Sequence, residues 1–179
     1  MSAAEGSARH GAGRPATIIV VIGPAGSGKS TVAAALGRRL GWPIADGDDF
    51  HSTASIEKMS SGQPLDDDDR LPWLAAIGRW IDEQVAANRS AIVACSALRR
   101  TYREMLRGGR SGVWFACLEV RREELDRRVG RRRGHFMPVS LVADQLKVQE
   151  PLGADEPGVI VDAGQPPQAV VAAIISRLP

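Results

Sequence analysis

The stretch TIIVVIGPAGSGKST, residues 17–31, decides the fold of this 179-residue chain. Residues 17–22 form a short apolar run rich in β-branched side chains, which predicts a buried strand. Residues 23–30 then read G-x-x-x-x-G-K-S, and residues 31–40 are expected to form a helix. A glycine-rich loop between a strand and a helix is the setting of a Walker A motif, so this stretch predicts a loop that binds the phosphates of a nucleotide.

The residue types in this loop suit phosphate binding. Its glycines allow backbone angles that a side chain disfavours, so successive N–H groups can point at phosphate oxygens, and the following helix adds the positive end of its dipole. Lys29 is expected to reach the β- and γ-phosphates, and the Ser30 hydroxyl to ligate Mg²⁺. The predicted nucleotide-binding residues are Gly23, Pro24, Ala25, Gly26, Ser27, Gly28, Lys29, Ser30 and Thr31.

Length and composition indicate one ordinary globular domain. Hydrophobic residues make up 44% of the chain and charged residues 25%, and a net charge of +2 is too small to require a nucleic-acid or membrane partner. Cys95 and Cys117 lie in apolar runs, which predicts buried, reduced thiols and a cytoplasmic protein. No apolar run approaches the ~20 residues that a membrane span needs. Residues 1–15 are expected to form a flexible tail ahead of a single domain at 16–179.

Predicted strands alternate with predicted helices along the whole chain. Further strands are expected at 43–46, 91–94, 113–120 and 159–161, and further helices near 55–61, 71–85, 98–106, 121–129, 140–150 and 168–178, with Asp67 or Asp68 capping the longest. This order predicts an α/β fold with a five-stranded parallel sheet flanked by helices on both faces. Ligands bind at the carboxyl ends of such strands. These ends carry Gly23, Asp46, Cys95, Glu119 and Asp162.

The residues at these strand ends narrow the class of nucleotide-binding protein. The guanine-reading N-K-x-D sequence is absent, and a D-x-x-G match at residues 155–158 lies too far along the chain, so a GTPase is disfavoured. The third strand ends in Cys95 without the usual acid, so Asp46 is expected to hold the metal together with Ser30. Asp46 and Asp48 alternate along a segment expected to be extended, which would turn Asp48 toward an incoming hydroxyl as its proton acceptor.

Four further segments carry a family resemblance. DGDDFH (46–51), IEKMSSGQPLDDDDRLPWL (56–74), ACSALRRTYREMLR (94–107) and GHFMPVSLVADQ (134–145) together resemble gluconate kinases of the thermoresistant P-loop type, from residue 17 over about nine-tenths of the chain. The resemblance implies a P-loop fold like that of nucleoside monophosphate kinases. It also implies Mg²⁺-dependent conversion of ATP and D-gluconate to ADP and 6-phosphogluconate, often by a homodimer.

An acidic sugar needs cations for its carboxylate and hydrogen-bonding side chains for its hydroxyls. The substrate-binding candidates are Asp48, His51, Lys58, Arg70, Arg99, Arg100 and His135. Among these, Arg70 and Arg99 are favoured for the carboxylate, because the guanidinium fork matches its geometry. Another polyol acid or shikimate remains an alternative substrate.

Residues 121–133 contain seven arginines, which allows two interpretations. The arginines could bind nucleic acid, as in an ATP-dependent nucleic-acid-binding module. A kinase lid at about 127–138 is favoured, because the cluster follows the fourth strand at the phosphate-binding end and contains acids. Arg128, expected to be catalytic, and Arg132 match basic positions in the resembled family. Gln165 and Pro166, in the loop after the last strand, are expected to lie against the adenine.

Overall fold

The computed structural model describes residues 15–131 and 139–179. Residues 1–14, nearly all of the predicted tail, lie outside this description. Five parallel strands form one sheet in the order β2-β3-β1-β4-β5. The strands are β1 (Ile18–Ile22), β2 (Ile44–Asp46), β3 (Ala91–Ala94), β4 (Val113–Glu119) and β5 (Gly158–Asp162). The predicted five-stranded parallel sheet is therefore confirmed.

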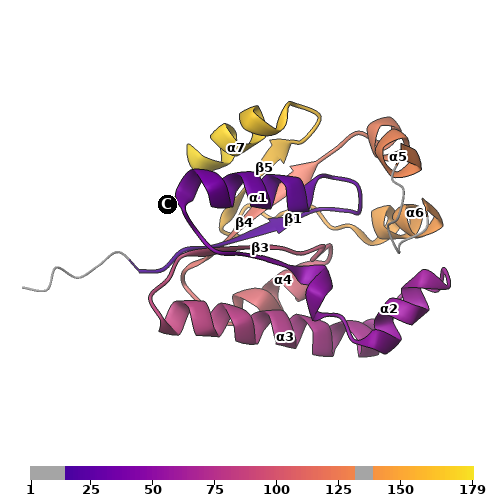
Figure 1. The fold of residues 1–179 in the computed structure, drawn as a ribbon, viewed down its shortest axis with the longest axis horizontal. Helices are drawn as coiled ribbons and strands as arrows, with labels where there is room; N and C mark the ends of the chain where they lie inside the picture. Colours follow the sequence, from indigo (N-terminus) through magenta and orange to yellow (C-terminus); the bar gives the residue numbers. More distant parts are fainter. Residues whose placement is uncertain (1–14, 132–138) are drawn as a thin grey trace, which may run out of the picture.

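Helices cover both faces of this sheet, as predicted. Figure 1 shows α1 and α7 on one face and α3 and α4 on the other, while α5 and α6 stand beyond the carboxyl ends of the strands. The helices are α1 (Lys29–Leu40), α2 (Thr53–Ser60), α3 (Asp67–Ala86), α4 (Arg100–Arg107), α5 (Arg122–Arg131), α6 (Val139–Val148) and α7 (Pro167–Ile175), with a 3₁₀ helix, η1 (Gly47–Phe50), after β2. None of the helices in the described ranges has both the length and the apolar character that a membrane crossing requires.

The central strand β1 contributes to both hydrophobic cores. Ile18 and Val20 pack with residues of α3 and α4, whereas Ile19 and Val21 pack with residues of α1 and α7. All of these side chains have no exposed surface, and each buried aliphatic side chain contributes about 1.5–3 kcal/mol to folding. The loop that follows β1 therefore starts from a rigid support.

The start of α3 differs from the prediction. Asp66 caps the helix: its side chain accepts a hydrogen bond from the Asp69 N–H, and the Asp69 side chain accepts one from the Asp66 N–H, each at 3.0 Å. The prediction that Asp67 or Asp68 provides the cap was wrong, because the helix begins one residue earlier. Asp67 is consequently the first helical residue, and its carboxylate is available for contacts with other elements.

Candidate active site

The loop between β1 and α1 has the backbone of a phosphate cradle. Gly26 and Gly28 lie in the left-handed region, with φ of 85° and 95°. A Cβ on Gly26 would come within 2.7 Å of a Val129 methyl group on α5, whereas a Cβ on Gly28 would point into open space. The loop thus packs against α5 on one side and presents its backbone to an open volume on the other, where it can bind an anion.

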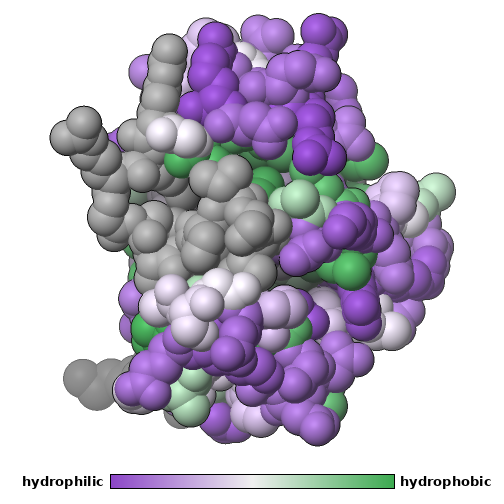
Figure 2. Space-filling model, turned by 90° about the vertical axis from the view of Figure 1, so that its right-hand side faces the viewer, coloured by the Kyte–Doolittle hydropathy of each residue, from purple (hydrophilic) through white to green (hydrophobic). Residues whose placement is uncertain are grey.

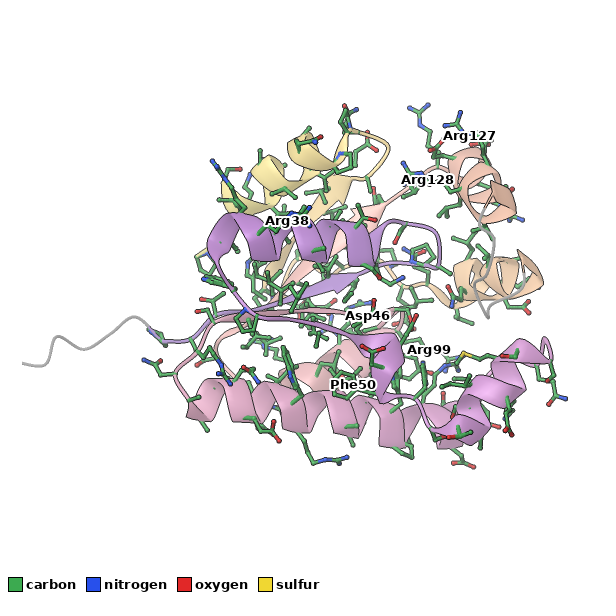
Figure 3. The ribbon with its side chains drawn as sticks, viewed as in Figure 1. Arg38, Asp46, Phe50, Arg99, Arg127 and Arg128 are labelled. Atoms are coloured by element: carbon green, nitrogen blue, oxygen red, sulfur yellow. The ribbon has the colours of Figure 1, made fainter. Side chains whose placement is uncertain are left out.

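The hydroxyl of Ser30 and the carboxylate of Asp46 meet beside this loop. Ser30 Oγ donates a 2.6 Å hydrogen bond to Asp46 Oδ2, and Asp46 Oδ1 accepts one of 3.1 Å from the Asp48 N–H. Asp46 lies at the junction of β2 and η1 (Figure 3). One hydroxyl and one carboxylate suit Mg²⁺, which takes its remaining ligands from water and phosphate oxygens. Within the described ranges, no three His, Cys, Asp or Glu side chains gather in a metal-binding cluster.

Arg128 links three parts of the nucleotide side of the site. Its guanidinium donates to the Ala163 carbonyl at 2.9 Å, to the Ser27 carbonyl at 3.5 Å and to the Glu124 carboxylate at 2.6 Å. The hydrogen bond from Arg128 lowers the pKa of Glu124 below its ordinary value. Arg128 therefore joins α5 to the phosphate cradle and to the loop after β5.

A cavity of about 370 Å³ opens between the cradle and the loop after β5. Gln165 and Pro167 line this cavity. Pro166, between them, is the residue that precedes α7. The lining further includes Gly26, Ser27, Gly28, Thr31 and Arg128. This cavity thus brings together part of the predicted phosphate-binding loop, Arg128 and Gln165, whereas the predicted Pro166 is not part of its lining.

A second cavity, of about 410 Å³, lies on the side of α3 and α4. Four of the predicted substrate residues line it, namely Asp48, His51, Arg70 and Arg99. Asp48 sits in the 3₁₀ helix η1 rather than in the extended segment that was predicted, so a tight turn directs it here. Figure 2 looks onto the end of the molecule that carries α5 and α6, where hydrophobic residues are visible between mostly hydrophilic ones. We call this second cavity the acceptor cavity.

His51 forms part of the wall of the acceptor cavity. Its ring stacks on Trp73 with centroids 4.5 Å apart and an angle of 9° between the planes, and the Trp73 indole donates a 2.7 Å hydrogen bond to the Gly47 carbonyl. Burial lowers the pKa of His51, opposed by Asp48 and assisted by Arg70. His51 is therefore mostly neutral at pH 7, and its buried Nδ1 has no hydrogen-bond partner within the described ranges.

Two predicted substrate residues lie apart from the lining of this cavity and form ion pairs. Lys58 contacts Asp66 at 2.9 Å and Asp69 at 2.5 Å, next to the cap of α3. Arg100 makes two hydrogen bonds to Asp155, of 2.6 and 3.0 Å. Asp155, the first residue of the D-x-x-G match at 155–158, is thus paired with Arg100. Two other predicted residues, Arg132 and His135, lie outside the described residues, as does most of the predicted lid at 127–138.

Three arginines of α5, Arg122, Arg127 and Arg128, pair with acids of the same helix. Arg122 lies 3.5 Å from Asp126, and Glu124 contacts both Arg127 and Arg128. Figure 3 shows Arg127 and Arg128 near the end of α5. This internal pairing reduces the positive charge that α5 would offer to a nucleic acid.

Sequence reasoning missed several residues at the site. Tyr102, the one tyrosine of the chain, and Trp73 line the acceptor cavity, and both belong to segments that carry the family resemblance. Gln145 on α6 also lines this cavity, and its Oε1 accepts a 2.7 Å hydrogen bond from the Ala25 N–H in the cradle. Gln145 is the last residue of the segment 134–145 that carries the family resemblance, but its role was missed because its contact spans 120 residues of sequence.

Comparisons with known proteins agree with this geometry. Residues 18–152 match a family model described as an AAA domain. The chain is 47% identical over 157 residues to a gluconokinase of Gluconobacter oxydans (strain 621H), which covers 88% of each protein. It is 39% identical over 159 residues to the thermoresistant gluconokinase of Escherichia coli (strain K12), covering 88% of this chain and 91% of that protein.

Solved structures give the same result. A gluconokinase from Sinorhizobium meliloti 1021 superposes with a TM-score of 0.80 at 42% identity and covers 92% of this chain and 91% of that one. Shikimate kinase from Aquifex aeolicus, at 20% identity and a TM-score of 0.57 over 89% of this chain and 94% of that one, shares the fold alone. With relatives well above 30% identity over most of both chains, the protein belongs to the gluconokinase family of P-loop kinases.

Proposed function

We propose that this protein transfers the γ-phosphoryl group of ATP to a hydroxyl of D-gluconate and releases ADP and 6-phospho-D-gluconate. The observation that carries the proposal is a pair of hydrogen bonds to one carboxylate: Ser30 Oγ and the Asp48 N–H both donate to Asp46. This pair joins the phosphate cradle to the turn that lines the acceptor cavity. A phosphoryl donor and a small polar acceptor can therefore meet there, as direct transfer requires.

On the donor side, the N–H groups of the cradle would bind phosphate oxygens, and Lys29 and Arg128 would neutralise their charge. Arg128 is already held by the carbonyls of Ser27 and Ala163, so little reorganisation is needed for it to act. Ser30 and Asp46 would hold Mg²⁺, which supplies positive charge that polarises the phosphoryl group when it is bound. Gln165 and the loop around it would contact the base.

On the acceptor side, Arg70 and Arg99 offer two guanidinium groups to the substrate carboxylate from the wall of the acceptor cavity. Asp48 would accept the proton of the attacking hydroxyl. The ring of neutral His51, which lines the same cavity, would contact the polyol chain. The cavity thus combines groups for a carboxylate and for a polyol chain.

An assay of ADP release over a panel of acceptors tests the proposal. The panel contains D-gluconate, other sugar acids, neutral glucose, shikimate and a nucleoside monophosphate, each with Mg²⁺ and ATP. We expect kcat/KM to be highest for gluconate, and glucose to be poor because it leaves Arg70 and Arg99 without a carboxylate. A higher kcat/KM for any other acceptor would reject gluconate as the substrate.

We also propose a homodimer located in the cytoplasm. Strand β5 is an edge of the sheet, and Ile160 on it is 43% exposed, which would suit a second copy of the chain. Cys95 and Cys117 are free thiols, as expected in a reducing compartment. Sedimentation equilibrium measures the mass of the particle, and a mass of one chain at micromolar concentration would reject the dimer.

A further inference from the structure

A single peptide group in the phosphate cradle is held from both sides. The carbonyl of Pro24 accepts a 3.0 Å hydrogen bond from Lys29 Nζ. The N–H of Ala25, which belongs to the same peptide group, donates a 2.7 Å hydrogen bond to Gln145 Oε1. One partner is the first residue of α1 and the other comes from α6, 120 residues along the chain from Ala25. The orientation of this peptide group therefore depends on α6.

The contact with Lys29 places this peptide group along the phosphate chain. The lysine of a Walker A motif reaches the β- and γ-phosphates. Since Lys29 Nζ lies 3.0 Å from the Pro24 carbonyl, this peptide group neighbours the side chain that is expected to bind the terminal phosphates, and its N–H is a candidate donor to the γ-phosphate. A neutral amide oxygen from Gln145 now occupies the position in front of this N–H.

Gln145 also belongs to the acceptor side. It lines the acceptor cavity together with Asp144 and Val148 of the same helix, with Asp48 of η1 and with Arg99 at the start of α4. The same side chain thus touches the γ-phosphate end of the cradle and faces the space for the acceptor. Among the described residues, Lys29 and Gln145 hold the two ends of one peptide group, yet only Gln145 lines the acceptor cavity.

We propose that Gln145 is a positioning residue that distinguishes ATP from ADP and couples the nucleotide to the acceptor cavity. With no γ-phosphate present, its carboxamide oxygen satisfies the Ala25 N–H. A γ-phosphate oxygen is a stronger, charged acceptor for the same N–H and would displace it. Displacement releases the carboxamide at the wall of the acceptor cavity, so the γ-phosphate changes the surface that an acceptor meets. ADP leaves the hydrogen bond of Gln145 in place.

Nucleotide binding measured by calorimetry tests this proposal without any acceptor. The full-length protein with Mg²⁺ is titrated with ADP and with the non-hydrolysable analogue AMPPNP. In Gln145→Ala, AMPPNP no longer displaces a hydrogen bond worth about 1 kcal/mol, so its Kd should fall about fivefold, while the Kd of ADP stays within twofold. In Gln145→Glu, a carboxylate faces the terminal phosphate, so the Kd of AMPPNP should rise about tenfold or more and that of ADP much less.

A control on the same helix separates this role from general damage to α6. Lys147, 74% exposed, pairs with Asp144 on the surface, and Lys147→Ala should leave both dissociation constants within twofold. Equal shifts for ADP and AMPPNP in the Gln145 variants, or no shift for either, would overturn the proposal. Gln145→Glu retains the size of the side chain, so it remains informative if the alanine variant folds poorly.

The coupling has a second readout. Thermodynamic linkage requires gluconate to change the affinity for AMPPNP by the same factor by which AMPPNP changes the affinity for gluconate. This factor should approach one in Gln145→Ala, whereas an unchanged factor would refute the coupling. The discrimination between ATP and ADP rests on the proposed nucleotide site only, and the coupling measured with gluconate rests on the proposed substrate as well. If the wild-type protein bound neither nucleotide, the proposed function and the proposed role of Gln145 would both be rejected. If it preferred another acceptor, only gluconate as the substrate would be rejected.

Discussion

The hydroxyl of Tyr102 donates a 2.5 Å hydrogen bond to Oδ1 of Asp67, and this joins α4 to the first turn of α3. The same carboxylate oxygen lies 3.5 Å from Arg99 and 3.8 Å from Arg70. The two guanidinium carbons lie 5.6 and 5.8 Å from the centre of the Tyr102 ring. Burial and the hydrogen bond to Asp67 raise the pKa of Tyr102. The carboxylate of Asp67 and the ring of Tyr102 therefore hold the guanidinium groups of Arg99 and Arg70 at the wall of the acceptor cavity.

The neighbours Arg99 and Arg100 provide a matched test of this arrangement. Arg99→Gln removes a charged group from the acceptor cavity, and hydrogen bonds to charged groups contribute about 1.5–3 kcal/mol, so the KM for gluconate should rise about 10- to 100-fold. Arg100→Gln breaks a surface pair with Asp155 and should change this KM by less than about threefold. Steady-state kinetics at saturating ATP measures both. A larger effect at Arg100 would assign the carboxylate to Arg100 instead.

Asp48 and Asp49 offer a second pair of neighbours within η1. Asp48 lines the acceptor cavity, and Asp49 is exposed. Asp48→Asn removes the proposed proton acceptor and should lower kcat by about 10²-fold or more, while the Kd of AMPPNP changes little. Asp49→Asn should retain near-normal kcat. Single-turnover measurements isolate the chemical step, and a normal rate in Asp48→Asn would exclude Asp48 as the base.

The sequence was sufficient for features that depend on local order. The apolar run of β1 and the glycine-rich loop after it are contiguous, so their pattern predicts a strand, a cradle and a helix together. The alternation of strands and helices then predicts the parallel sheet. Asp46 was predictable as the partner of Ser30. Asp46 ends β2 and Ser30 follows the loop after β1, and the carboxyl ends of these parallel strands lie at the same edge of the sheet.

The sequence was not sufficient where a side chain has a choice of partners. Nothing local separates Arg99 from Arg100, but one faces the acceptor cavity and the other faces Asp155. Lys58 was predicted to bind substrate, and its contacts with Asp66 and Asp69 at the cap of α3 could not be foreseen from the residues around it. The contact of Gln145 with Ala25 depends on how α6 packs at the end of the sheet. Such partners are set by tertiary packing, which a single sequence does not display.

The two cysteines should report on the integrity of the core. Burial raises the pKa of Cys95 to about 12 and that of Cys117 to about 11, so almost no thiolate is present at pH 8. We expect neither thiol to react with an aromatic disulfide reagent in the native protein, and both to react in denaturant. The absorbance of the released thiolate measures this. Rapid reaction of a native thiol would show that the core opens readily.

A buried ion pair joins α4 to the segment that follows α6. Arg103, only 1% exposed, donates hydrogen bonds of 2.6 and 2.9 Å to Glu156. It also donates to the backbone carbonyls of Leu98 at 3.1 Å, Glu150 at 3.2 Å and Pro151 at 3.0 Å. Arg103→Met would leave the buried Glu156 carboxylate without its cation, with the Gly153 N–H still donating to it at 2.8 Å, and should lower the free energy of unfolding by about 3–5 kcal/mol, measured in urea. A loss below about 1 kcal/mol would contradict this role.

The pH dependence of unfolding provides an independent test of the pair. Burial is the largest influence and acts to raise the pKa of Glu156. The hydrogen bonds from Arg103 and the Gly153 N–H and the positive charges of Arg103 and Arg100 together outweigh it, so the pKa lies below the ordinary 4.5. A depressed pKa stabilises the fold above about pH 4.5, and this contribution is lost as the pH falls through the folded-state pKa. The free energy of unfolding of Glu156→Gln should therefore lie furthest below that of the wild type at pH 7 and approach it toward pH 3. Glu104→Gln, in an exposed pair with Arg100, should show little difference at either pH. A deficit in Glu156→Gln that stayed constant with pH would show that its effect comes from packing and not from charge.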